Sequence, residues 1–290
     1  MLSDLLANGL VSGALIALLA AGFSLVYTAQ GFFVFTFGAS YSWAAYTVLA
    51  FREQVPLVLS TVCGVAIACT LAMSLERLLY QPLRRRKENA LVLMLVSIGA
   101  YAVLENLVGI VFGDSTRRIA DAATETGLML LGAHVSKTQL LIVLISLISL
   151  GAAAIILHAS SLGNQLRAVA NDELLARVVG IKVDRVCMIG AGLGGTLGGI
   201  AGILQGIDTG LVPTMGFQGL LLAVLAAVVG GVNSFWGATC GGFLIGLVRF
   251  LAVWRLPVEW QDAIVFLLLF IFLIVRPEGL FGKPLRGNTI

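Results

Sequence analysis

Uninterrupted apolar stretches recur from end to end of the chain, and they restrict its fold more than any other feature. A helix of about twenty apolar residues crosses the hydrocarbon layer of a membrane, which is roughly 30 Å thick. Only helices and closed barrels satisfy their backbone polar groups in lipid, and barrel strands would alternate apolar and polar residues. These stretches do not alternate. The sequence therefore predicts an all-α fold, a polytopic membrane helical bundle forming a single domain over residues 1–290.

Charge excludes two other classes of protein. Charged residues make up 11% of the chain and hydrophobic residues 59%, whereas roughly a quarter of a soluble domain is charged. The formal net charge is only +3, and no basic face suited to nucleic acid is evident. A water-soluble domain and a nucleic-acid binder are both excluded.

The apolar pattern predicts about nine spans, with eight as the alternative. The predicted spans are Leu5–Tyr27, Phe32–Phe51, Val55–Leu75, Ala90–Phe112, Gln139–Leu157, Val186–Gly206, Gln218–Val232, Trp236–Val253 and Gln261–Val275. Gln218–Val232 is short for a full crossing, and a tilted or re-entrant segment is an open alternative there.

Basic residues predict the orientation, because cytoplasmic segments of membrane proteins are enriched in Lys and Arg. Three segments carry such groups: Arg77, Arg84, Arg85, Arg86 and Lys87; Arg167, Arg177, Lys182 and Arg185; and Arg276, Lys283 and Arg286. These segments should be cytoplasmic. The amino terminus should lie outside and the carboxy terminus in the cytoplasm. The external loop 113–138 has mixed charge and is predicted to be a small ordered cap or hairpin, with a solvated connector as the alternative.

Small residues recur every fourth position in several spans, a spacing that lets helices approach closely in lipid. The two longest series are Gly190, Gly194, Gly198, Gly202 and Gly206, and Gly9, Gly13, Ala17 and Ala21. Gly242 and Gly246 extend the pattern to the eighth span. Residues 190–195 also match the dinucleotide pattern GxGxxG, but that pattern requires a preceding strand. Helix packing is therefore the predicted role.

The segment 159–185 carries the most informative polar sequence. Asn171 or Asp172 is suited to cap a short helix, with Glu173 in its first turn. Leu174 and Leu175 begin an apolar face that Val178 and Val179 continue, and Gly180 is suited to end the helix. An amphipathic helix beside a bundle lies on lipid or docks into a partner. The absence of Trp and Phe from this one favours docking.

The run RAVANDELLARVVGI, residues 167–181, resembles the coupling segment of permeases from ATP-binding-cassette (ABC) importers for branched-chain amino acids. It departs at Leu174 and Leu175, where the family usually has Glu-Ala. Family-like motifs elsewhere are ERLLYQPL at 76–83, PTMGF at 213–217, VVGGVNSFWGA at 228–238 and RPEGLFG at 276–282. The resemblance implies that contact with an ATPase is made by Asn171, Asp172, Glu173, Leu174, Leu175, Ala176, Arg177 and Gly180.

The same resemblance implies a multi-pass protein of the bacterial inner membrane, with several partners. These are a second permease subunit (related or identical), two cytoplasmic ATP-binding subunits and an external solute-binding protein. The sequence contains no GxxxxGK[ST] phosphate-binding loop, so ATP would be hydrolysed on the partners. We expect no cofactor, metal or catalytic residues in this chain, because no nucleophile–base pair or metal cluster stands out. An uncoupled channel or secondary carrier is the alternative from another class.

Interrupted helices line cavities or are buried in protein, so two segments next to helix ends are predicted to form the translocation path. The residues concerned are Phe35, Phe37, Gly38, Tyr41, Pro213, Met215 and Gly216. Both segments follow a span rich in glycine or alanine, which hints at an internal repeat. Where the family has Asn-Phe-Ala-His-Gly-Glu, residues 34–39 read VFTFGA. Urea, short amides and aromatic acids are therefore alternatives to branched-chain amino acids as the substrate.

Ionisable residues are rare in the spans, and buried ones often mark transport sites. Glu105 is predicted to make a structural hydrogen bond. Asp208 is expected at the external mouth of the path, and Arg249 lies late in the eighth span.

Overall fold

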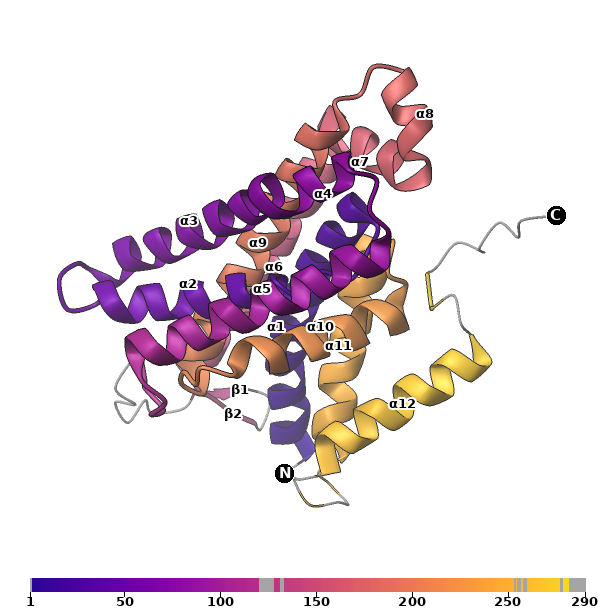
Figure 1. Ribbon diagram of the computed structural model, residues 1–290. Coiled ribbons are helices and arrows are strands. Elements are labelled where there is room, and N and C mark those ends of the chain that lie inside the picture. Colours follow the sequence, from indigo (N-terminus) through magenta and orange to yellow (C-terminus); the bar gives the residue numbers. More distant parts are fainter. Residues whose placement is uncertain are drawn as a thin grey trace.

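The computed structural model describes residues 2–119, 128–130, 133–252, 254, 257, 260–276 and 279–281 (Figure 1). Its elements in chain order are α1 (Leu2–Gln30), α2 (Phe37–Phe51), α3 (Leu57–Leu75), the π-helix η1 (Glu76–Tyr80), α4 (Gln81–Arg85), α5 (Ala90–Phe112), β1 (Leu128–Leu130), β2 (Ala133–Val135), α6 (Lys137–Ala159), α7 (Ser161–Asn171), α8 (Glu173–Val178), α9 (Val183–Asp208), α10 (Met215–Gly230), α11 (Phe235–Ala252) and α12 (Gln261–Val275). Apart from one short antiparallel pair, β1 with β2, the described elements are helical. The predicted class of polytopic helical membrane protein is confirmed.

Six helical stretches of the described residues are long and apolar enough to cross a membrane. They are Ser3–Gln30, Leu57–Arg85, Ala90–Phe112, Lys137–Ala159, Val183–Asp208 and Phe235–Ala252. The apolar helices α2, α10 and α12 have only 15, 16 and 15 residues. At 1.5 Å per residue such a helix reaches about 22–24 Å, less than the thickness of the hydrocarbon layer.

The largest differences from the predicted spans are at the start of the second and at the end of the third. α2 begins at Phe37 rather than Phe32. The third helix does not end at Leu75 but continues through η1 and α4 to Arg85. In η1 the N–H of Gln81 donates to the carbonyl of Glu76, five residues back. Pro82 follows at once, and a proline ring disturbs the carbonyl four residues before it. A wider π turn accommodates that ring without ending the helix.

The buried centre of the bundle is formed by α1 and α9, which run antiparallel. Ala29 of α1 lies against Gly190 of α9, and Gly22 lies against Gly194. Residue numbers therefore decrease along α1 in the direction in which they increase along α9. A Cβ atom added at Gly194 would be 2.6 Å from the carbonyl oxygen of Gly22. The predicted use of spaced glycines as packing surfaces is confirmed.

The helix pairings repeat in the two halves of the chain. α2 packs on α3, α9 and α5, and α10 packs correspondingly on α11, α1 and α12. The short helices α2 and α10 touch at their first turns, where a Cβ atom on Gly38 would be 2.6 Å from the carbonyl oxygen of Gly216. The internal repeat at which the sequence hinted is therefore present in the packing.

Candidate functional site

The segment 159–185 forms two short helices, α7 and α8, at the end of the bundle opposite the amino terminus (Figure 1). α7 is held by apolar contacts: Leu166 and Val169 join a buried cluster with Ala29 and Val186. No helix is predicted from the sequence over Ser161–Asn171. The spacing of Gly163, Leu166 and Val169, the three residues that it buries, was the signal that could have revealed it.

The local prediction for α8 is confirmed at both ends. The Asp172 side chain caps the helix, because its Oδ1 accepts a hydrogen bond of 2.9 Å from the N–H of Leu175. Asn171 is instead the last residue of α7. Glu173 lies in the first turn of α8 and pairs with Arg177 at 2.8 Å. Gly180 ends the turn with φ = +89°, a conformation that glycine adopts at little cost.

The outer face of α8 is apolar and open. Ala176 is buried and belongs to the same cluster as the buried residues of α7. Its side chain therefore packs α8 against the bundle. The other apolar side chains of α8 and its C-cap are exposed. Their exposed fractions are 76% for Leu174, 61% for Leu175, 83% for Val178 and 76% for Val179. We call these four residues the α8 knob. Four large exposed aliphatic side chains together are suited to bury against another protein.

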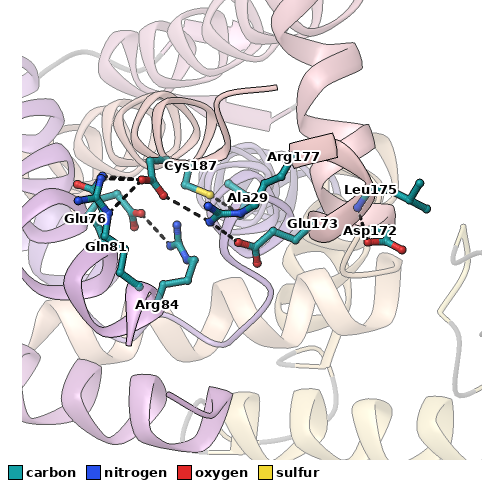
Figure 2. A network of polar contacts seen from close by, with 11 residues as sticks. Ala29, Glu76, Gln81, Arg84, Asp172, Glu173, Leu175, Arg177 and Cys187 are labelled. Atoms are coloured by element: carbon teal, nitrogen blue, oxygen red, sulfur yellow. Dashed lines mark hydrogen bonds and ion pairs between the residues drawn. The ribbon is translucent and has the colours of Figure 1, made fainter. Parts of the chain in front are cut away.

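A polar network connects α8 to two long helices (Figure 2). Asp184, in the first turn of α9, accepts hydrogen bonds from Gln81 at 2.9 Å and from Arg85 at 3.0 Å. Arg177 of α8 lies 3.7 Å from the same carboxylate. A displacement of α8 would therefore act on the start of α9 and on the end of the third helix.

A buried ion pair stiffens the end of the third helix beside this network. Arg84 Nη2 lies 2.8 Å from Glu76 Oε1, and the two side chains are only 10% and 1% exposed. The pair bridges the π turn, because the residues are eight positions apart. In the sequence, Arg84 indicates only the orientation of the chain, and nothing marks Glu76 as its partner.

Asp172→Ala should weaken α8 without unfolding the bundle. The loss of an N-cap costs about 1 kcal/mol of helix stability, and the α8 knob would then spend more time out of position. We expect uptake to fall several-fold with unchanged protein levels in the membrane. Rescue by Asp172→Asn, which can still cap, would separate capping from charge. Equal uptake by the alanine variant and the wild type would contradict the role of the cap.

Most of the predicted path residues are buried rather than open. Gly38 and Gly216 form the contact between α2 and α10. Phe37 is buried against Phe23, with ring centroids 5.8 Å apart. The backbone N–H of Phe35 donates to Ser97 Oγ at 2.7 Å.

Two path residues, Tyr41 and Met215, line a cavity of about 440 Å³ at the end of the bundle that holds the start of α1. Pro213 is buried in the break before α10. That break is paired to the loop after α5, because Leu211 and Arg117 exchange two backbone hydrogen bonds of 2.7 and 3.0 Å. The path assignment stays a prediction.

Glu105, Asp208 and Arg249 occupy different surroundings. Glu105 accepts a 2.9 Å hydrogen bond from the hydroxyl of Tyr101, which confirms its predicted structural hydrogen bond. Asp208 and Arg249 both line the 440 Å³ cavity.

Comparison with known proteins agrees with the resemblance of the coupling segment. Residues 5–273 match the family described as branched-chain amino acid transport system / permease component. The chain is 30% identical over 294 residues to the high-affinity branched-chain amino acid transport system permease protein LivH of Escherichia coli K12, covering 96% of this chain and 94% of LivH. It is 30% identical over 307 residues to the corresponding permease protein BraD of Pseudomonas aeruginosa, covering 96% and 95%.

A solved structure shares the fold. PsaBC from Streptococcus pneumoniae in complex with Fab aligns with a TM-score of 0.50 and 12% sequence identity, covering 93% of this chain and 91% of that one. The chain belongs to the family of branched-chain amino acid transport system permease components, and it is a multi-pass membrane subunit of an ABC transport system rather than a catalytic subunit.

Proposed function

We propose that this chain is one of two permease subunits of an importer for branched-chain amino acids, driven by two ATP-hydrolysing subunits that grip the α8 knob. The names of LivH and BraD support this substrate class. An external solute-binding protein delivers the solute. The second permease subunit is an identical or a related chain.

The observation that carries the proposal is the exposed apolar knob on a well-anchored helix. An ATPase can bias the permease only through contacts that differ between its states. The α8 knob offers the contact surface, and Arg177 with Asp184 offers a route from that surface to α9. An uncoupled channel or secondary carrier has no need of either feature.

We further propose nine crossings, with the amino terminus outside and the carboxy terminus cytoplasmic. The basic residues Arg84 and Arg85 lie beside α8, and α1 starts at the opposite end of the bundle. Six long helices alone would leave both ends of the chain on one side. The shorter helices α2, α10 and α12 supply three further crossings, and eight crossings remain the alternative if one of them is re-entrant.

Cross-linking tests the docking directly. A cysteine at Val178, in a variant without native cysteines, should form a zero-length or short cross-link to the ATPase subunits in inner-membrane vesicles. A matched cysteine at Val58, 76% exposed at the start of α3, should form none. The proposal fails if Val178→Cys reacts only with lipid probes or with external maleimide.

A further inference from the structure

The cavity of about 440 Å³ lies at the end of the bundle far from α8, among α1, α2, α6, α9, α10, α11 and α12. Its volume is in the range of small-molecule sites, roughly 300–1,000 Å³. It is lined by both charged and aliphatic side chains. A site of this kind suits a solute that has a polar end and an apolar end.

Arg249 gives one side of the cavity a cation with spare hydrogen-bonding capacity. Its Nη2 lies 3.1 Å from Oδ1 of Asp262, at the start of α12. Its Nε is buried and has no hydrogen-bond partner among the described residues. A guanidinium carries five N–H donors in a planar fork that matches a carboxylate. Arg249 can therefore hold Asp262 and still bind a second carboxylate.

Asp208, the last residue of α9, gives the same cavity an anion. Within the part of the chain that the structure describes, its carboxylate has no ion pair or hydrogen bond. The nearby polar side chains of Gln205 and Thr209 are hydrogen-bonded to each other rather than to Asp208. Nε2 of Gln205 donates to Oγ1 of Thr209 at 2.8 Å. An unpaired carboxylate at the edge of a low-dielectric cavity attracts an ammonium group.

Aliphatic side chains form another part of the lining. Leu15 and Leu19 of α1 and Leu225 of α10 are buried there, and Leu222 is half-buried. They offer apolar surface to a branched aliphatic group, whose transfer from water is favourable by about 0.8 kcal/mol per buried CH₂.

We propose that this cavity is a binding site for a zwitterionic aliphatic α-amino acid inside the permease itself. Arg249 binds the carboxylate, Asp208 binds the ammonium group, and the leucine-lined wall receives the side chain. This inference rests on the proposed importer function and assigns recognition of its substrate to named residues of the permease. Urea and short amides lack the carboxylate that would use the free donors of Arg249.

Binding of tritiated L-leucine to the assembled transporter in nanodiscs, without the solute-binding protein, tests the assignment. Competition with leucinamide, which lacks the carboxylate, and with 4-methylpentanoate, which lacks the amine, identifies the group that each residue recognises. Arg249→Gln should weaken leucine binding and leave leucinamide binding unchanged. Asp208→Asn should weaken leucine binding and leave 4-methylpentanoate binding unchanged. Each loss should be about tenfold to hundredfold, since a hydrogen bond to a charged group contributes about 1.5–3 kcal/mol.

Glu53→Gln, an exposed change outside the cavity, is the control and should bind leucine as the wild type does. The assignment is overturned if both cavity variants bind leucine normally, if leucine and its analogues weaken equally, or if a wild-type complex that imports leucine binds none in this assay. Normal ATP-driven uptake in such a case would leave the importer proposal standing. A wild-type complex that shows no ATP-dependent uptake of any solute would instead contradict the importer proposal.

Discussion

Leu175→Asp should abolish ATP-driven uptake while the permease still inserts and folds. Leu175 is 61% exposed, so water can hydrate a carboxylate there in the isolated permease. In the assembled transporter, however, the proposed docking would enclose it against the ATPase, where an unpaired carboxylate costs about 3–5 kcal/mol. A loss of that size corresponds to more than about a hundredfold in the docked population. Uptake into proteoliposomes and ATP hydrolysis by the same sample measure the two sides of the coupling.

The matched control is Leu57→Asp. Leu57 is 47% exposed and begins α3 at the opposite end of the bundle from α8. An acidic residue in the first turn of a helix is favourable, so this variant should transport normally. Uptake at the wild-type rate by Leu175→Asp would remove the main support for the docking role. Equal losses in both variants would point to a general folding defect instead.

Helix positions could be predicted from the sequence wherever an apolar run has clear ends. α5 and α12 have the bounds Ala90–Phe112 and Gln261–Val275 that the sequence predicts. The start of α2 could not be predicted, because the segment Phe32–Thr36 is as apolar as the membrane-spanning helices. The N–H groups of Phe35 and Thr36 are satisfied by Ser97 Oγ of α5, at 2.7 and 3.2 Å. Hydropathy does not reveal a partner that lies sixty residues along the chain.

The candidate coupling site also has features that local sequence predicts and features that depend on contacts distant in the chain. The cap of α8 by Asp172 and its end at Gly180 depend on residues within one turn, so local sequence predicts them. The connection from Arg177 through Asp184 to Gln81 joins residues about a hundred positions apart. Such a contact is set by how α3 and α9 pack, and that packing follows from which glycines face which helix. The spacing of the glycines predicts close packing but not the partner.

The largest stability effect is expected at such a glycine contact, in Gly246→Ala. α1 packs more extensively on α11 than on any other helix. A Cβ atom on Gly246 would be 2.2 Å from Cα of Gly13. Neither atom belongs to a flexible side chain, so the two helices must separate. Overpacking of a well-packed core typically costs 1–3 kcal/mol, and we expect at least about 3 kcal/mol here because backbone meets backbone. The apparent Tm of the detergent-solubilised protein measures the loss.

Gly151→Ala is the matched control for that experiment, since it makes the same chemical change in the interior of another long helix. In the described structure no heavy atom from beyond the neighbouring backbone of α6 itself lies within 4 Å of a Cβ atom on Gly151. The higher helix propensity of alanine, about 1 kcal/mol over glycine, is common to both variants. Gly246→Ala should therefore lower the apparent Tm while Gly151→Ala leaves it unchanged or raises it. Equal Tm values would mean that α1 and α11 are not in backbone contact at Gly13. A lower apparent Tm for Gly151→Ala alone would indicate that a further subunit packs against α6. Only a surface covered in the assembly would clash with one added methyl group there.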